Sequence, residues 1–216
     1  MKLFERLMAS NQSVWDSYVN HKFVVKLASG TLREPCFKYY LGQDYLFLFH
    51  FARAYALSVY KSESLSEVRQ SLSGLIAIID VEMDLHVKFC ADWDLSEAQM
   101  ACLPEATETM AYTRYVLERG LSGDLLDLHT ALAPCIIGYA EIGRRLKDQA
   151  INNPFGDWIK MYASEEYQEL AKTEIQQLDK LMINRGGEGR FDSLSKIFNQ
   201  ENRLEIDFWK MGLDAR

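Results

Sequence analysis

The sequence predicts an all-α protein, a single-domain helical bundle over residues 1–216, and three observations support this fold class. Apolar residues recur three or four positions apart through most of the chain, which is the spacing of a helix face. No segment sustains the alternation of apolar and polar residues that is typical of strands. Only four prolines interrupt the pattern, and 48 % of the residues are hydrophobic, enough for a sizeable core.

The first two predicted helices cover residues 3–20 and 36–61. The first is amphipathic, because Glu5, Arg6 and Asp16 lie among its apolar residues, and this pattern is unlike a signal peptide. The second is rich in aromatic side chains.

Two further helices are predicted over residues 65–92 and 105–119. Ser64 offers a hydroxyl at the expected N-cap of one, and Pro104 precedes the other. Ser96, between the two helices, is expected to begin only a short turn.

The second half of the chain predicts four more helices, over 124–151, 155–163, 164–184 and 191–212. Ser164 is the expected cap of the third of these helices. Pro134 lies inside the first and removes one backbone donor there, so it is expected to kink the helix. The stretch RGGEGR at 185–190 has the glycines of a phosphate-binding loop but no preceding strand and no GK[ST] ending, so we interpret it as a turn between helices.

The charge balance argues against nucleic acid as a partner. The chain has 24 basic and 31 acidic residues, a net charge of −7, and no cluster of Lys or Arg longer than a pair. A nucleic-acid-binding surface needs a basic stripe.

No uninterrupted apolar run approaches the ~20 residues of a membrane span. The four cysteines form no CxxC pair, so we expect reduced thiols in a cytoplasmic protein.

Asp44 is an acid in the middle of an aromatic stripe. At helical spacing, one face of the second predicted helix carries Tyr40, Asp44, Phe47, Phe51 and Tyr55. A carboxylate between aromatic side chains is either a surface acid at the edge of the stripe or a polar group placed to recognise a ligand.

Cys135 follows Pro134 in the apolar run ALAPCIIGYAEIG, residues 131–143. Free cysteine is among the most buried residue types, so a small core residue is one interpretation. The other is a nucleophile, which needs a partner that stabilises its thiolate or accepts its proton. No histidine stands at helical spacing from Cys135, and both interpretations stay open at this point.

Glu205 shares a helix face with Glu201, Phe208 and Trp209. An acid desolvated by aromatic neighbours has a raised pKa, which suits it to protonate a substrate near neutral pH. The alternative is a surface acid beside a tryptophan at the edge of the core.

Three tyrosines, Tyr112, Tyr139 and Tyr162, have apolar neighbours one helical turn away. Core packing with a hydrogen-bonded hydroxyl is the simpler interpretation of any one of them, and a role in a pocket is the alternative.

A metal site is not expected. Glu82 and His86 form one pair at helical spacing, whereas a di-iron bundle needs Glu-x-x-His pairs on more than one helix.

Four blocks of the sequence together carry a family resemblance: YLGQDYLFLFHFARAYAL, ALAPCIIGYAEIG, WIKMYAS and EIDFW. In this order and spacing they resemble the TenA / thiaminase II family, over essentially the whole chain. The resemblance implies a haem-oxygenase-like all-helical fold and a homotetramer. It also implies hydrolysis of an aminomethyl pyrimidine to the hydroxymethyl pyrimidine and ammonia, and cleavage of thiamin to the same pyrimidine and a thiazole alcohol. It implies no metal and no organic cofactor.

The resemblance also implies roles for individual residues. Cys135 matches the nucleophile that adds to the pyrimidine ring, Glu205 the acid that exchanges a proton with a ring nitrogen, and Asp44 the acid that binds the 4-amino edge. Tyr112 and Tyr162 match the two tyrosines whose hydroxyls line the reacting end. Phe47 and Tyr139 match the two rings that lie on either side of the pyrimidine. Some relatives carry tyrosine where this chain has Phe47.

Rival functions make different demands on the sequence. An oxidase of quinone-cofactor biosynthesis or a metal-dependent oxygenase of the same fold would need histidine-rich or metal-ligand sites, which are not evident in the sequence. Direct regulation through DNA is disfavoured by the charge of −7. A protein of this fold that binds a pyrimidine without turnover, or acts as a regulator, is the remaining alternative.

Overall fold

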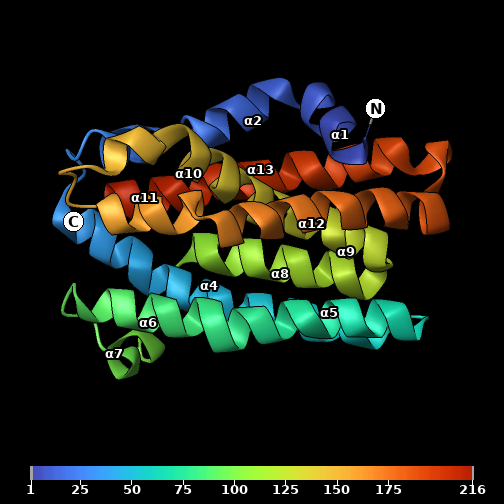
Figure 1. The fold of residues 1–216 in the computed structure, drawn as a ribbon, viewed down its shortest axis with the longest axis horizontal. Helices are drawn as coiled ribbons and strands as arrows, with labels where there is room; N and C mark the ends of the chain where they lie inside the picture. Colours follow the sequence, from blue (N-terminus) through green and yellow to red (C-terminus); the bar gives the residue numbers. More distant parts are fainter. Residues whose placement is uncertain (1, 216) are drawn as a thin grey trace. The chain divides into compact units, whose positions relative to one another are not determined.

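The computed structural model describes residues 2–215, and within that range every regular element is a helix, which confirms the all-α class (Figure 1). The chain forms two compact units. The first unit contains the chain up to Leu32 together with His129–Lys210, and the second contains Arg33–Leu128 and the chain from Met211 onward. The organisation of residues 1–216 as a single domain stays a prediction.

The helices of the first unit come from both ends of the chain. Its α-helices are α1 (Leu3–Ser10), α2 (Gln12–Val19), α3 (Lys22–Ala28), α10 (Tyr139–Leu146), α11 (Gly156–Ala163), α12 (Glu165–Leu181) and most of α13 (Phe191–Asp214). Shorter helical segments are η2 (Pro134–Gly138), η3 (Lys147–Ala150), η4 (Met182–Gly186) and η5 (Glu188–Arg190). The boundary between the units falls within α9 (Leu125–Ala133) and within α13.

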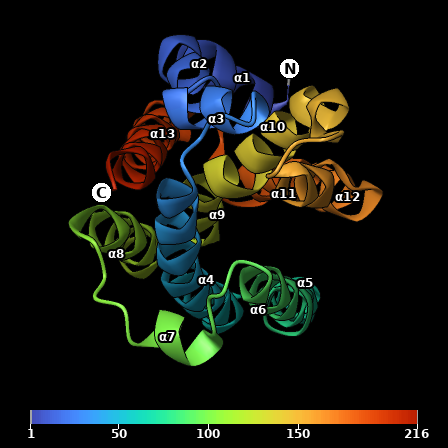
Figure 2. The same ribbon diagram turned by 90° about the vertical axis from the view of Figure 1, so that its left-hand side faces the viewer.

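The second unit is arranged around one long helix. Its elements are α4 (Glu34–Lys61), α5 (Leu65–Ala77), η1 (Ile78–Glu82), α6 (Met83–Ala91), α7 (Glu97–Ala101) and α8 (Thr107–Ser122). Helix α4 lies between α8 on one side and α5 with α6 on the other (Figure 2). It begins two residues before its predicted start, because a proline is accommodated in the first helical turn, where its missing N–H costs nothing.

The predicted N-terminal helix over 3–20 is wrong in one respect, since it is two helices that meet at Asn11. The Asn11 side chain donates to the Leu7 carbonyl at 2.8 Å and to the Ser195 hydroxyl at 2.9 Å, and accepts from Asn199 at 2.9 Å. An asparagine whose amide bonds to its own and neighbouring elements competes with the helical ladder. Helix α3 was not predicted; it begins after His21, whose Nδ1 accepts from the Phe23 N–H at 3.2 Å.

The predicted caps are confirmed, whereas the stretch predicted as a turn between helices is itself mostly helical. The hydroxyls of Ser64, Ser96 and Ser164 each accept from a backbone N–H in the first turn of α5, α7 and α12. The short turn expected after Ser96 is thus a short helix. In the glycine-rich stretch 185–190, the first two residues end the π-helical segment η4, Gly187 lies in the left-handed region at φ +77°, and the last three residues form η5, which leads into α13.

The continuous helical stretch Leu125–Ala150 is, among the described residues, the one helix long and apolar enough to cross a membrane; the mean hydropathy of its most apolar 18-residue window is 1.2. The sequence prediction missed it because Asp127 and Glu141 interrupt the apolar run. Of its most apolar window, 83 % is buried inside the structure. That burial is typical of a core helix.

Helices α10 and α11 approach so closely that only glycine fits at position 143. A Cβ on Gly143 would lie 2.5 Å from the Tyr162 carbonyl oxygen, and backbone cannot move aside as a side chain can.

We expect Gly143→Ala to destabilise the fold by about 1–3 kcal/mol, measured by urea unfolding. Gly189→Ala is the matched control, because nothing lies within 4 Å of its added Cβ. Equal stability of the two variants would contradict the close approach.

Candidate functional site

Cys135 lies in a widened turn of its helix. The expected effect of Pro134 was a kink; the structure has a π-helical segment, η2, which begins at that proline. The Tyr18 hydroxyl donates to the Pro134 carbonyl at 3.2 Å, and Gly138 leaves room for the Tyr18 ring. Single π-helical turns are frequent at functional sites. Cys135 is partly exposed there, whereas the structure buries the cysteines at 36 and 90 and exposes the one at 102.

Tyr139 and Tyr162 belong to one aromatic cluster in the first unit. Tyr139 follows Cys135 by one helical turn and lies with its ring centroid 4.9 Å from that of Tyr162. The Trp209 ring lies 5.2 Å from Tyr139, and the Trp158 ring lies 4.6 Å from Tyr162. All four side chains are buried. The structure therefore brings two of the predicted pocket tyrosines together.

Helix α13 places two acids in the interior of the first unit. Glu205 and Glu201 are both 0 % exposed, so Glu205 is not the surface acid of the alternative interpretation. Trp209 follows Glu205 by one turn and lies 5.0 Å from the Phe23 ring. Burial, and the neighbouring Glu205, hold the pKa of Glu201 well above its usual range.

Asp44 is also buried, but in the second unit and with polar neighbours. The Tyr40 hydroxyl donates to Asp44 Oδ2 at 3.3 Å, and His86 Nδ1 lies 3.6 Å from the same oxygen. His86 Nε2 lies 3.0 Å from the Leu41 carbonyl. A carbonyl only accepts, so Nε2 carries the hydrogen and Nδ1 of a neutral ring faces Asp44 as an acceptor. Burial lowers the pKa of His86 to about 4.

A second cysteine lies near this acid. Burial, with the nearby charge of Asp44, raises the pKa of the Cys90 thiol to about 12. A thiol with so high a pKa is neither nucleophilic nor easily oxidised at neutral pH. Cys90 is therefore a packing residue.

Phe47 and Tyr112, predicted as a wall and a hydroxyl of the pocket, lie together in the second unit. Their ring centroids are 4.7 Å apart, and the Phe51 ring lies 5.6 Å from Phe47. Phe47 comes from α4 and Tyr112 from α8, so their relative position depends on how these two helices are joined.

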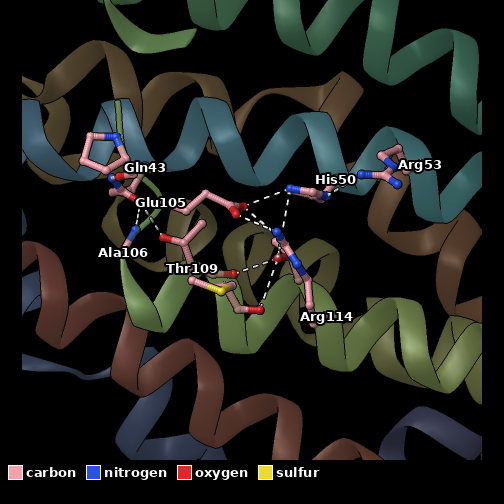
Figure 3. Close-up of polar contacts among 10 residues, drawn as sticks. Gln43, His50, Arg53, Glu105, Ala106, Thr109 and Arg114 are labelled. Carbon is pink, nitrogen blue, oxygen red and sulfur yellow. Dashed lines mark hydrogen bonds and ion pairs between the residues drawn. The ribbon is translucent and has the colours of Figure 1, made fainter. Parts of the chain in front are cut away.

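A polar network joins α4 to α8 (Figure 3). Gln43, next to Asp44 in sequence, donates to the Pro104 carbonyl at 3.0 Å and accepts from the Ala106 N–H at 2.9 Å and the Thr109 hydroxyl at 2.7 Å. These bonds use every polar atom of a buried amide, which fixes the start of α8 against the turn that carries Asp44.

Beyond Gln43, the same two helices are joined by charged groups. Glu105 receives two hydrogen bonds from the Arg114 guanidinium, at 2.9 and 2.6 Å, and lies 2.9 Å from His50 Nε2. The Arg114 guanidinium lowers the pKa of Glu105, while burial together with the charge of Arg114 lowers that of His50.

The sequence analysis missed the supporting roles of Gln43 and His86. The sequence suggested His86 as a metal ligand with Glu82 or as one of several histidines that could pair with Cys135, but His86 faces Asp44. Within residues 2–215, no group of three or more His, Cys, Asp or Glu side chains is placed to hold a metal ion. The only available signal for Gln43 was a polar residue next to Asp44 in an aromatic helix; its partners lie more than sixty residues along the chain.

The low pKa of His86 predicts a specific loss of stability in acid. The ring is neutral in the folded protein down to a pKa of about 4, against 6.5 ordinarily. This contribution is therefore present above pH 6.5 and is lost as the pH falls toward 4, by up to about 3 kcal/mol. His86→Gln cannot take up the proton, so we expect it to lose less stability than wild type between pH 7 and 4.5. Urea unfolding at both pH values measures this.

The control is Lys88→Gln, which removes an exposed charge from the same helix without changing titration in this range. It is expected to keep the wild-type pH dependence. Equal losses in the His86 variant and wild type would show that His86 does not titrate as a buried neutral ring.

Comparison with known proteins places the chain among relatives that align end to end. Residues 8–215 match the TENA/THI-4/PQQC family. An aminopyrimidine aminohydrolase from Halalkalibacterium halodurans is 36 % identical over 219 residues, covering 100 % of this chain and 97 % of that protein.

Two solved structures support the same placement. A TenA family transcription regulator from Silicibacter sp. TM1040 has a TM-score of 0.95 and 42 % identity, covering 99 % of this chain and 97 % of that one. A TenA homologue from P. horikoshii OT3 has a TM-score of 0.92 and 28 % identity, covering 100 % of both chains. These likenesses agree with the haem-oxygenase-like fold expected from the sequence, and this chain belongs to the TENA/THI-4/PQQC family.

Proposed function

We propose that this chain is an aminopyrimidine aminohydrolase, which converts 4-amino-5-aminomethyl-2-methylpyrimidine to the 5-hydroxymethyl compound and ammonia. The observation that carries the proposal is full-length similarity to relatives named aminopyrimidine aminohydrolase, one of them 36 % identical. The position of Cys135, partly exposed in a π-helical turn one turn before a buried tyrosine, supports it.

Cys135 acts as the nucleophile in this proposal. Its thiolate adds to a pyrimidine ring carbon and forms a C–S bond, and the displaced electron pair goes to a ring nitrogen, which takes a proton from Glu205. With aromaticity broken, the amino group leaves the exocyclic methylene as ammonia. Water adds to the methylene, and the reverse steps return the proton and expel the thiolate. Splitting the substitution in this way lowers each barrier.

The burial of Glu205 suits it to the proton transfer, because a desolvated acid stays protonated to higher pH than an exposed one. Asp44 binds the 4-amino edge of the pyrimidine, where a carboxylate accepts hydrogen bonds from an amino group. Phe47 and Tyr139 pack on the ring faces, and the hydroxyls of Tyr112 and Tyr162 contact the reacting groups.

Thiamin is the second proposed substrate. Its cleavage yields the same hydroxymethyl pyrimidine, with the thiazole alcohol in place of ammonia as the leaving group. The addition of Cys135 and the role of Glu205 are unchanged, because both act on the pyrimidine ring common to the two substrates.

We expect Cys135→Ser to abolish hydrolysis of the aminomethyl pyrimidine and of thiamin, with a loss of at least ~10²–10⁴-fold, since serine is a much weaker nucleophile. Chromatography of the hydroxymethyl product measures both reactions. Cys102→Ser is the matched control: it removes an exposed thiol and is expected to keep full activity.

The outcomes separate the candidate functions. Product from wild type and from the Cys102 variant, but not from the Cys135 variant, supports hydrolysis through Cys135. Binding of the pyrimidine by folded wild type without product would instead support a non-catalytic binding protein. The ratio of the two wild-type rates identifies the preferred substrate.

We also propose that the chain assembles as a homotetramer, through an apolar face of the second unit. A hollow of about 650 Å³ is lined by side chains of α4, α5, η1, α6 and the first residue of α7, mostly apolar ones. Phe49 and Ile79 in its lining are about half exposed. An exposed apolar surface of this kind is typical of interfaces.

Ile79→Glu places a charge on this face and is expected to give a smaller assembly than wild type, because burying an unpaired carboxylate is costly. Light scattering after size exclusion would report wild type at about four times the 24.9 kDa of one chain. Ile183→Glu, at an exposed residue outside the hollow, is the control. A monomeric wild type would contradict the tetramer, and a tetrameric Ile79 variant would contradict this interface.

A further inference from the structure

Gln168, near the start of α12, joins three helices of the first unit. Its side-chain nitrogen Nε2 donates to the Ala140 carbonyl of α10 at 2.9 Å and to the Tyr162 carbonyl of α11 at 2.8 Å. A carbonyl only accepts and a primary amide has two N–H donors, so these two bonds use both of its hydrogens. The proposed mechanism gives Gln168 no role.

The two carbonyls differ in how firmly their own helices hold them. Ala140 lies inside the continuous helical stretch Leu125–Ala150, with helical turns on both sides of it. Tyr162 is the last residue but one of α11, a helix of eight residues. The carbonyls in the last turn of a helix have no partner within that helix. The bond from Gln168 therefore attaches the free end of a short helix to a long one.

The end of α11 is held closely at Tyr162. Gly143 of α10 approaches the Tyr162 carbonyl so closely that no Cβ fits between them, and the bond from Gln168 comes from α12. Tyr167, the residue before Gln168, packs its ring edge-on against the Tyr162 ring, with centroids 4.8 Å apart. Two consecutive residues of α12 thus contact both the ring and the backbone of Tyr162.

These contacts set the distance between two of the predicted pocket residues. The Tyr162 ring lies 4.9 Å from the ring of Tyr139, and Tyr139 is the residue before Ala140. The amide of Gln168 therefore links the backbone at both tyrosines. In a close-packed interior, a shift of the Tyr162 backbone carries its side chain with it.

We propose that Gln168 is a positioning residue, which places the Tyr162 hydroxyl relative to Tyr139 by bonding the end of α11 to α10. This rests on the proposed function, in which the Tyr162 hydroxyl contacts the reacting groups and Tyr139 packs on the pyrimidine. Gln168 acts through Tyr162 and contacts neither the substrate nor the nucleophile.

The test begins with Gln168→Met, which keeps the length of the side chain and removes both N–H donors. We expect kcat for the aminomethyl pyrimidine to fall by about 10–10²-fold, because a misplacement of about 1 Å caused away from the reacting atoms can cost this much. KM is expected to stay within about twofold of wild type, since the groups that bind the pyrimidine are unchanged.

A double-mutant cycle separates positioning from a loss of folded protein. Tyr162→Phe removes the hydroxyl through which Gln168 is proposed to act. In that background, Gln168→Met should lower kcat by no more than about twofold, because residues that act through one group are not additive. The same factor in both backgrounds would overturn the proposal and leave Gln168 a packing residue.

Two further variants make the result specific. Gln168→Lys keeps N–H donors at a half-buried position and is expected to restore kcat toward wild type. Gln176→Met removes an exposed amide from the same helix and is expected to keep wild-type kcat and KM. Wild-type kcat in Gln168→Met, or an equal loss in the Met and Lys variants, would overturn the role of the two donors.

A second measurement does not depend on activity. Near-ultraviolet circular dichroism reports the fixed packing of aromatic rings, and Tyr162 lies 4.6 Å from the Trp158 ring as well as near Tyr139. We expect a weaker aromatic band in Gln168→Met than in wild type or Gln176→Met, and identical spectra would overturn the positioning. If wild type hydrolyses neither substrate, the proposed function fails, while the spectra still decide whether Gln168 positions Tyr162.

Discussion

The constraint on which the rest of the molecule depends is the burial of carboxyl groups inside aromatic helices. Asp44, Glu201 and Glu205 all lie within the core, in a protein of net charge −7. Each must be neutral, hydrogen-bonded or coupled to a neighbour, because an isolated buried charge costs more than a single domain can bear. Long helices such as α4 and α13 meet this demand with aromatic side chains that exclude water at three- and four-residue spacing.

The two acidic regions meet the constraint differently. Asp44 accepts a hydrogen bond from the Tyr40 hydroxyl, and the His86 ring lies 3.6 Å from the same carboxyl oxygen, so the Asp44 side chain is held in place. Glu201 has no such donor among the described residues, and burial together with the neighbouring charge of Glu205 holds its pKa well above the usual range. A fixed acceptor suits recognition, and a poorly solvated acid suits proton transfer. Different surroundings are how one fold gives like residues unlike tasks.

The features predicted from the sequence are those that depend on neighbouring residues, such as helices and their caps. Helical period gave the helices of the second unit within a few residues, and Ser64, Ser96 and Ser164 marked three starts, because a cap uses only neighbouring backbone groups. The break at Asn11 was missed, since its cause is α13, more than 180 residues away. The contact between His86 and Asp44 was missed for the same reason: a long-range pair leaves no spacing in a single sequence.

Pro134 shows that a local signal can predict where a helix is interrupted without predicting the hydrogen-bond pattern found there. Proline has no N–H and crowds the preceding turn, so a break was expected there. The observed interruption is a π-helical turn, a type of turn at which helices also kink, and α9, η2 and α10 follow one another along the chain without a gap. Tyr18 packs against this turn: its hydroxyl donates to the Pro134 carbonyl, and the Tyr18 ring occupies the space that a Cβ on Gly138 would need. The turn that leaves Cys135 partly exposed is thus built jointly by a proline, a glycine and a tyrosine from the other end of the chain.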